Sequence, residues 1–284
     1  MTETTQIPTI TLNDGRAIPQ LGFGVFQVPP EDTAEATALA LEVGYRHIDT
    51  AEMYGNEQGV GDAVRDSSLD RDEIWITSKL ANSKSEPDEI RAAFEETLGK
   101  LGSDHVDLFL IHWPLPTRPG SDFVTRWKVL EEFRADGRAR SIGVSNFEVA
   151  HLERLAAECD VVPAVNQIEI HPYLLNEEVR AYGEGHGIAT EAWSPIAQGG
   201  VLGDPVITEI AERLERTAAQ VVLRWHIQRN SIVFPKSVTP SRVRENFELF
   251  DFELSGAEMD AITGLDRGEA GRTGPNPNRF TGGD

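Results

Sequence analysis

Four residues suited to proton transfer stand at or just after the ends of successive apolar runs: Asp49, Tyr54, Lys79 and His112. A tyrosine hydroxyl has an ordinary pKa near ~10, and a nearby ammonium lowers that pKa by favouring the phenolate. Lys79 could supply this charge and Asp49 its counter-ion, because a buried ammonium needs an opposite charge. His112 could hold a carbonyl oxygen against Tyr54. The set predicts a proton donor aimed at an oxygen, with no nucleophile and no metal-ligand set, which suits carbonyl reduction or its reverse.

A second group surrounds a predicted helix start after the last apolar run: Lys236, Ser237, Arg242, Glu245 and Asn246. Backbone N–H groups and the helix dipole favour an anion at such a position. Two cations and a hydroxyl there predict a phosphate site, and the second cation suggests a phosphomonoester beyond a pyrophosphate. The alternative is a solvated helix start without a ligand.

Amide and hydroxyl side chains end two further runs. Ser145 and Asn146 end one run and Gln167 ends the other, so these groups could bind a carboxamide. Trp193 ends the next run and offers a flat face for stacking on a planar ring, with ordinary barrel packing as the alternative. The sequence has no Gly-x-Gly-x-x-Gly before a helix, so the usual dinucleotide-binding fold is not expected.

Each residue of the first group also has a structural explanation when it is taken alone. Asp49 could cap a loop, Tyr54 could be half-buried in its loop, Lys79 could face water, and His112 could be a core histidine. Their joint occurrence at three successive run ends favours one common site.

The apolar runs alternate with stretches of helical spacing. Parallel strands buried on both faces give such runs, and the alternation predicts a (β/α)8 TIM barrel. The length of 284 residues fits one barrel domain over residues 1–284. The carboxyl ends of barrel strands form one rim, so residues that end different runs are expected to converge there.

Residues 9–12 and 17–19 flank Asn13-Asp14-Gly15, a tight-turn signal, so we expect a hairpin at the bottom of the barrel. The first barrel strand is expected at 21–25. The predicted helices cover 31–43, 56–65, 87–101, 123–135, 147–158, 177–184, 218–228 and 241–247, and two additional helices cover 205–215 and 255–265. Ser255 and Glu258 form a capping box for the last of these. Residues 271–284 are expected to be irregular.

Composition excludes several classes of partner. Acidic residues number 47 against 26 basic ones, and a net charge of -21 repels nucleic acid and anionic membranes. Residues 1–4 lack the pattern of a secretion signal, and no apolar run approaches the ~18 residues of a membrane span. The single cysteine, Cys159, excludes an intramolecular disulfide. We therefore expect a cytoplasmic protein whose partner is a small molecule.

Three motifs resemble the aldo-keto reductase family. Residues 44–51, Tyr54, 55–57 and 60–61 resemble the first signature of the family, and residues 107–114 resemble the segment around its active-site histidine. Pro235, Lys236 and Ser237, together with Arg242, Glu245 and Asn246, resemble its cofactor-phosphate loop.

The resemblance implies a barrel that binds NADPH, with Tyr54 as general acid in a tetrad with Asp49, Lys79 and His112. It also implies that Ser145, Asn146 and Gln167 bind the nicotinamide amide and that Trp193 stacks on the ring, and Ser194 is counted with these cofactor-binding residues. The phosphate end is assigned to Lys236, Ser237, Arg242, Glu245 and Asn246. A monomer is the family-based expectation.

Some residues depart from the animal members of the family. The Trp-Ser-Pro sequence at 193–195 is more similar to prokaryotic 2,5-diketo-D-gluconate reductases, whereas many animal members carry tyrosine in place of Trp193. Phe26 stands where several animal enzymes have tryptophan. We expect an aromatic-walled substrate pocket lined by Phe23, Phe26, His112 and Trp113, and a short tail at 274–278 that leaves it less enclosed.

Three functions stay open at this point. The leading expectation is NADPH-dependent reduction of aldehydes or ketones, with sugar-derived and 2-oxo carbonyls among the candidates. A cofactor-binding redox sensor or regulatory subunit with little turnover is the alternative, and a phosphate-binding barrel isomerase or lyase is the third. The sequence does not define the physiological substrate, the preferred direction or the oligomeric state.

Overall fold

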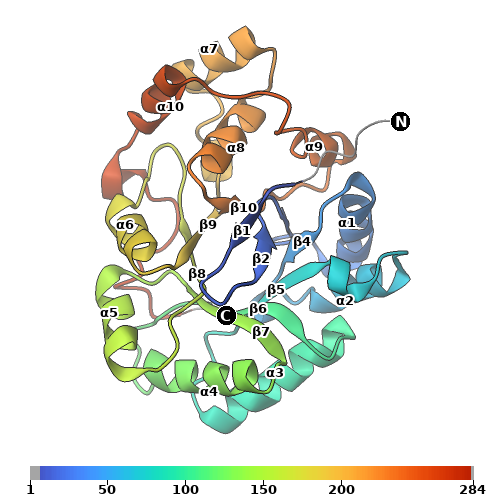
Figure 1. Ribbon diagram of the computed structural model, residues 1–284, viewed down its shortest axis with the longest axis vertical. Coiled ribbons are helices and arrows are strands. Elements are labelled where there is room, and N and C mark those ends of the chain that lie inside the picture. Colours follow the sequence, from blue (N-terminus) through green and yellow to red (C-terminus); the bar gives the residue numbers. More distant parts are fainter. Residues whose placement is uncertain (1–6, 283–284) are drawn as a thin grey trace.

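Eight parallel strands form a barrel that helices surround (Figure 1). A computed structural model of the chain describes residues 7–282. Neighbouring strands pair in the order β10-β9-β8-β7-β6-β5-β4-β3. The strands are β3 (Phe23–Gly24), β4 (His47–Asp49), β5 (Trp75–Leu80), β6 (Val106–Ile111), β7 (Ala139–Ser145), β8 (Val165–Glu169), β9 (Ala189–Trp193) and β10 (Ile232–Val233). The predicted (β/α)8 architecture is confirmed.

The seam between β3 and β10 closes the barrel. Leu21 pairs with Val233 in a parallel bridge, and the Gly22 N–H donates to the Val233 carbonyl at 2.7 Å. A Cβ on Gly24 would lie 2.7 Å from the Phe234 carbonyl oxygen, so no residue larger than glycine fits where β3 passes the backbone of Phe234. The pairing is short, which explains why β3 is shorter than the predicted strand at 21–25.

Helices begin and end at residues with clear local signals. Proline occupies the first turn of α1, α3, α7 and α9, where its missing N–H costs nothing. Gly44 ends α1 with a φ of 125°, which favours glycine. The helices are α1 (Pro30–Val43), α2 (Glu57–Asp66), α3 (Pro87–Leu101), α4 (Phe123–Ala135), α5 (Val149–Glu158), α6 (Glu177–Gly185), α7 (Pro205–Leu214), α8 (Ala218–Gln228), α9 (Pro240–Glu245) and α10 (Gly256–Thr263).

The predicted hairpin is present and lies within the ring of strands (Figure 1). It consists of β1 (Thr9–Thr11) and β2 (Ala17–Pro19), which pair antiparallel. Leu12 and Ile18 are buried in a second, smaller core with side chains from the barrel interior: Trp75, Leu108, Leu110, Ala164, Val165 and Ile232. The hairpin therefore closes the barrel at the end opposite the strands' carboxyl termini.

The additional helices α7 and α10 are confirmed, and Ser255 caps α10 through a capping box with Glu258. α9 is shorter than the predicted helix at 241–247. It starts one residue earlier, at Pro240, and ends two residues earlier, at Glu245. The tail at 271–284 is expected to be irregular. Gly271 ends the 3-10 helix η4 (Gly268–Gly271), and no helix or strand occurs in 272–282. The expectations for residues 1–4 and 283–284 lie outside the described part of the chain. Within residues 7–282, no helix is long and apolar enough to span a membrane.

Candidate active site

The carboxyl ends of β4, β5 and β6 bring the four predicted catalytic side chains together. Tyr54 ends the short 3-10 helix η1 (Glu52–Tyr54), which Gly55 terminates in the left-handed conformation. The Lys79 ammonium donates to the two Asp49 carboxylate oxygens at 2.7 and 2.8 Å and to the Tyr54 hydroxyl at 3.3 Å. The Tyr54 and His112 rings meet edge to face, with centroids 5.7 Å apart. The four side chains thus form one cluster on one rim.

Lys79 and Asp49 form a buried ion pair. Burial lowers the pKa of Lys79, but the charges of Asp49 and Tyr54 and their hydrogen bonds outweigh this effect, so the pKa is raised and the ammonium is retained. Burial raises the pKa of Asp49, whereas Lys79 and Gln167 act in the opposite direction. The Thr50 carbonyl also accepts from Lys79, at 2.9 Å, so the ammonium is held from three sides. A buried charge requires such a complete set of ion-pair and hydrogen-bond partners.

Tyr54 differs from the prediction in one respect. Lys79 does lower the pKa of the hydroxyl, but burial raises it by more, and Asp49 also raises it. The prediction that this phenol is more acidic than free tyrosine is therefore wrong. A hydroxyl with a raised pKa is fully protonated at neutral pH, so it can donate a proton. Burial and the charge of Lys79 place the pKa of His112 well below its usual range, and the imidazole is neutral.

The predicted amide-binding residues lie beside this cluster and are bonded to one another. The Ser145 hydroxyl donates to the main-chain carbonyl of Gln167 at 2.8 Å, and Asn146 Nδ2 donates to the main-chain carbonyl of His112 at 3.0 Å. The Trp193 indole N–H donates to Asn146 Oδ1 at 2.8 Å, which fixes the ring while the side chain stays half-buried. Asn146 adopts a φ of 64°, a left-handed conformation that asparagine tolerates well. A hydrogen-bonded network thus joins β6, β7, β8 and β9.

Ser194 follows Trp193 with a φ of 49°, and this turn leads the chain away from β9. The α8 residue His226 supports the turn, since its Nε2 lies 3.0 Å from the Pro195 carbonyl oxygen. Ser194 is half-buried, so its side chain is partly accessible beside the Trp193 ring.

The predicted phosphate residues lie on the segment between β10 and the end of α9. Lys236 and Arg242 are exposed, and neither forms an ion pair with any residue of the described 7–282 segment. Ser237 accepts from the Thr239 N–H at 3.1 Å. Glu245 accepts from the Thr217 hydroxyl at 2.7 Å, and the adjacent Asn246 is buried. α9 has six residues, so the side-chain cations contribute more to an anion site here than the helix dipole does.

Aromatic rings surround the mouth above Tyr54. Phe26 is 55% exposed and lies 5.0 Å from the Tyr54 ring centroid. Trp113 lies 6.5 Å from Trp193 and 4.5 Å from the tail residue Phe280, also between centroids.

Phe23 does not join these rings. It is 1% exposed and packs edge to face against Tyr45 at 5.8 Å. The structure therefore places Phe23 in the core, and we leave it out of the proposed pocket.

Two buried carboxylates near the site were not assigned a role from the sequence. Glu191 on β9 accepts from Gln167 Nε2 at 2.8 Å. Glu169, at the end of β8, accepts from the Thr273 N–H at 2.6 Å and the Gly274 N–H at 3.1 Å, which ties the tail to the barrel mouth. The charge of Glu191 inside strand β9, between Thr190 and Ala192, is the signal that could have identified this residue.

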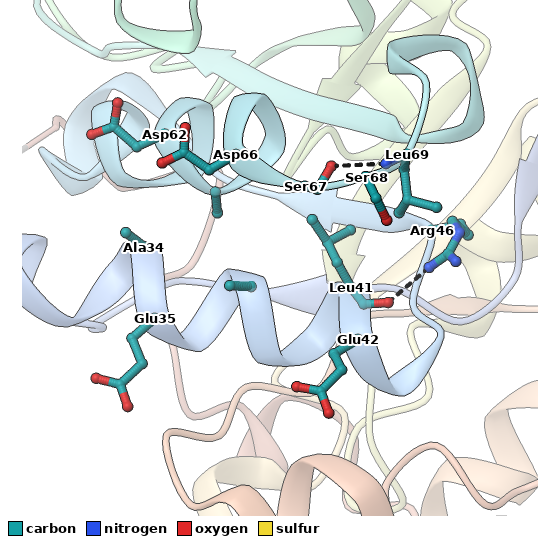
Figure 2. A pocket seen from close by; sticks show the side chains of 12 residues that line it. Ala34, Glu35, Leu41, Glu42, Arg46, Asp62, Asp66, Ser67, Ser68 and Leu69 are labelled. Atoms are coloured by element: carbon teal, nitrogen blue, oxygen red, sulfur yellow. Dashed lines mark hydrogen bonds between the residues drawn. The ribbon is translucent and has the colours of Figure 1, made fainter.

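A separate surface groove of about 580 Å³ lies between α1 and α2 (Figure 2). Carboxylates of Glu35, Glu42, Asp62 and Asp66 surround it, and Arg46 in the groove donates to the Leu41 carbonyl at 2.9 Å. None of the predicted site residues lines this groove. Among residues 7–282 there is also no cluster of side chains able to hold a metal ion. The barrel mouth is therefore the candidate active site.

Comparisons with known proteins agree with this fold. The family model described as the Aldo/keto reductase family matches residues 20–267. An aldo-keto reductase of Mycolicibacterium smegmatis is 52% identical over 273 residues, which cover 96% of this chain and 98% of that protein. A methylglyoxal reductase DkgA of Yersinia pestis is 49% identical over 278 residues, covering 97% of this chain and 98% of the relative.

A solved structure with the same fold was crystallised with a nucleotide. It is a variant of Gox0644 in complex with NADPH, it shares 45% sequence identity, and it superposes with a TM-score of 0.92 over 97% of this chain and 99% of that one. The chain belongs to the aldo/keto reductase family.

Proposed function

We propose that this protein is an NADPH-dependent oxidoreductase that reduces aldehydes and ketones to alcohols. Membership of the family, relatives that are methylglyoxal reductases, and a structural neighbour bound to NADPH support this function. The single observation that carries it is the contact of 3.3 Å between the Lys79 ammonium and the Tyr54 hydroxyl at the barrel mouth. The monomeric state and the cytoplasmic location stay predictions.

The residues at the mouth fit a nicotinamide coenzyme. Both N–H groups of the Gln167 amide are occupied by Asp49 and Glu191, so its carbonyl oxygen is the group left to accept from a carboxamide. Trp193 is held by Asn146 with its ring partly accessible, which suits stacking on a planar ring. Lys236 and Arg242, which pair with no acidic side chain among residues 7–282, suit the phosphate end.

The chemistry follows from the charges around Tyr54. When bound, NADPH supplies the hydride. Tyr54 donates its proton to the carbonyl oxygen of the substrate, and Lys79 stabilises the phenolate that this leaves behind. Asp49 keeps Lys79 charged, and the neutral His112 imidazole can donate to the same carbonyl oxygen and orient it. The reverse reaction uses the same groups, with the Tyr54 phenolate as base.

The pocket walls favour small carbonyl compounds. Phe26, Trp113 and Phe280 give an aromatic surface around Tyr54 without a charged side chain among them. A 2-oxo aldehyde such as methylglyoxal is our first candidate, since several relatives are methylglyoxal reductases, and sugar-derived carbonyls are the second.

Replacing Tyr54 by Phe tests the mechanism. General acid catalysis contributes roughly 10²- to 10⁴-fold, so we expect kcat with methylglyoxal to fall by at least about 100-fold. The affinity for NADPH, measured by quenching of tryptophan fluorescence, should stay within about twofold because the variant keeps the ring and its packing against Phe26. Equal losses of turnover and of coenzyme binding would remove Tyr54 from the acid role.

The wild-type protein in the same assay separates the enzyme from a redox sensor. An enzyme oxidises NADPH with at least one member of a panel of aldehydes and ketones. Tight binding of NADPH without oxidation across the panel would support the sensor instead.

A further inference from the structure

Glu191 lies in the barrel interior beneath the proposed coenzyme site. Its side chain is 0% exposed, and its Oε2 accepts from Gln167 Nε2 at 2.8 Å. The same nitrogen of Gln167 donates to Asp49 Oδ2 at 2.9 Å, and Asp49 binds Lys79. A continuous chain of polar contacts therefore runs from Lys79 through Asp49 and Gln167 to Glu191, across β5, β4, β8 and β9.

This chain fixes the orientation of the Gln167 amide. A carboxyl oxygen on each side of the nitrogen leaves only one arrangement that satisfies both contacts, with NH2 toward Asp49 and Glu191 and the carbonyl oxygen turned away. Without Glu191 one N–H would be buried without an acceptor, and the amide could rotate. The face that Gln167 presents to a ligand is thus set by a residue that does not touch the ligand.

We propose that Glu191 is a positioning residue of the coenzyme site, which fixes the Gln167 amide and whose charge state biases the site between the reduced and the oxidised coenzyme. The inference rests on the proposed function, because it assigns Gln167 to the nicotinamide carboxamide. The bias between the two coenzyme forms follows from the charge of the nicotinamide ring, which is neutral in NADPH and positive in NADP+.

The charges inside the barrel support a change of ionisation near neutral pH. Two carboxyl groups, Asp49 and Glu191, lie near one ammonium, that of Lys79, and of these two carboxyl groups only Asp49 contacts it directly. Burial and then repulsion by Asp49 raise the pKa of Glu191 to about 8, against smaller opposing effects of Gln167 and Lys79.

The positions paired with Glu191 on the flanking strands carry no charge, and the next carboxylate along β8, Glu169, lies two residues beyond Gln167. β8 presents the neutral Gln167 and β10 presents Ile232 at the paired register. Glu191 is therefore protonated at neutral pH and ionised above about pH 8, where it adds one negative charge beside Gln167. Its Oε1 has no hydrogen-bond partner within the described residues, so no direct contact at that atom offsets the charge, and only the Gln167 hydrogen bond and the more distant Lys79 favour the ionised form.

The experiment measures the dissociation constants of NADPH and NADP+ between about pH 6.5 and about pH 9.5 by tryptophan fluorescence. For the wild-type protein we expect the affinity for NADP+ relative to NADPH to rise by about five- to tenfold across this range, because a new buried charge attracts the positive ring. Glu191→Gln keeps an acceptor for Gln167 but cannot ionise. This variant should bind NADPH at pH 7 with an affinity within about twofold of wild type. Its ratio of NADP+ affinity to NADPH affinity should not change with pH.

Glu191→Met removes the acceptor and tests the positioning role. Leaving an N–H of Gln167 unpaired should weaken both coenzyme forms about tenfold, whereas kcat at saturating NADPH should fall far less than in Tyr54→Phe. Glu57→Gln is the matched control. Glu57 is another buried carboxyl, but it accepts from the Ser78 and Thr97 hydroxyls away from the coenzyme site, so its variant should keep the wild-type pH dependence.

Two results would overturn the inference. One is a Glu191→Gln protein whose NADP+ to NADPH ratio follows pH as in wild type, and the other is a Glu191→Met protein with unchanged affinities. Failure of the proposed function looks different, since it is read in the wild-type protein, which would then bind neither coenzyme or would bind NADPH without oxidising it with any carbonyl of the panel.

Discussion

Lys236 and Arg242 are exposed cations without an ion-pair partner among residues 7–282, on a protein with a net charge of -21. We expect Lys236→Met and Arg242→Ala each to weaken NADPH binding about tenfold or more, because a charge-assisted hydrogen bond contributes about 1.5–3 kcal/mol. The affinity for NADH, which lacks the phosphomonoester, should change little. Titrations of both coenzymes by fluorescence measure the ratio of the two affinities.

Lys128→Met provides the control for removing a positive charge. Lys128 is exposed on α4, far from the phosphate segment in the sequence, and its loss should leave both affinities unchanged. If Lys236→Met and Arg242→Ala lower the affinities for NADPH and NADH equally, the assignment of these residues to the phosphomonoester is wrong.

At the scale of single residues, the sequence revealed which side chains meet but not their electrostatic state. Asp49, Lys79 and His112 could be predicted to converge because each one ends an apolar run, and the barrel rim brings such ends together. The pKa of Tyr54 depends on how much of the hydroxyl the surrounding packing buries, which spacing does not encode. Whether the Phe23 side chain points toward Tyr45 or toward the pocket likewise depends on the twist of β3 and on its register with β4.

At the scale of elements, predictions were best where a local signal marks a boundary. α3 starts at Pro87 and ends before Gly102, which has a φ of 60°, and its predicted bounds agree with the structure. β3 and β10 have two residues each. Their length depends on how many residues of the two strands pair at the seam, and this pairing joins residues far apart in the sequence. Glu169 gave no local signal of its function either, since it binds a tail more than 100 residues later.

The tail is an element without regular structure, yet it supports Trp193. Glu169 holds the Thr273 and Gly274 N–H groups, and a Cβ on Gly274 would overlap the Trp193 ring. We expect Gly274→Ala to displace that ring and weaken NADPH binding by about three- to tenfold, since stacking of an aromatic ring contributes about 0.5–1.5 kcal/mol. Fluorescence titration of NADPH measures the change.

Gly99→Ala is the matched control for this substitution. Gly99 lies in α3 with open space around the site of a new Cβ, so alanine there should leave NADPH affinity unchanged and stabilise the protein by about 1 kcal/mol. Unchanged NADPH affinity in Gly274→Ala would mean that the tail does not position Trp193.

At the scale of the whole molecule, the charge balance sets a condition on stability. The surface carries many ion pairs, such as Arg65 with Asp62 and Arg91 with Glu132, but acidic residues outnumber basic ones 47 to 26. Exposed pairs contribute about 0–1 kcal/mol each, so they do not offset the repulsion among the unpaired carboxylates. The folded state brings these carboxylates closer together than the unfolded chain does, and repulsion therefore destabilises the fold at neutral pH.

Added salt should relieve this repulsion. The Debye length falls from about 30 Å at 0.01 M to about 10 Å at 0.1 M ionic strength, so we expect Tm at pH 7 to rise by several degrees over this range and beyond. Near the isoelectric point of about 4.7 the net charge is close to zero, and the same salt should leave Tm unchanged or lower it by screening ion pairs. Differential scanning calorimetry with NaCl and KCl at equal ionic strength separates screening from ion-specific effects. A Tm that falls with salt at pH 7 would mean that attractive pairs, rather than net repulsion, dominate the surface of this protein.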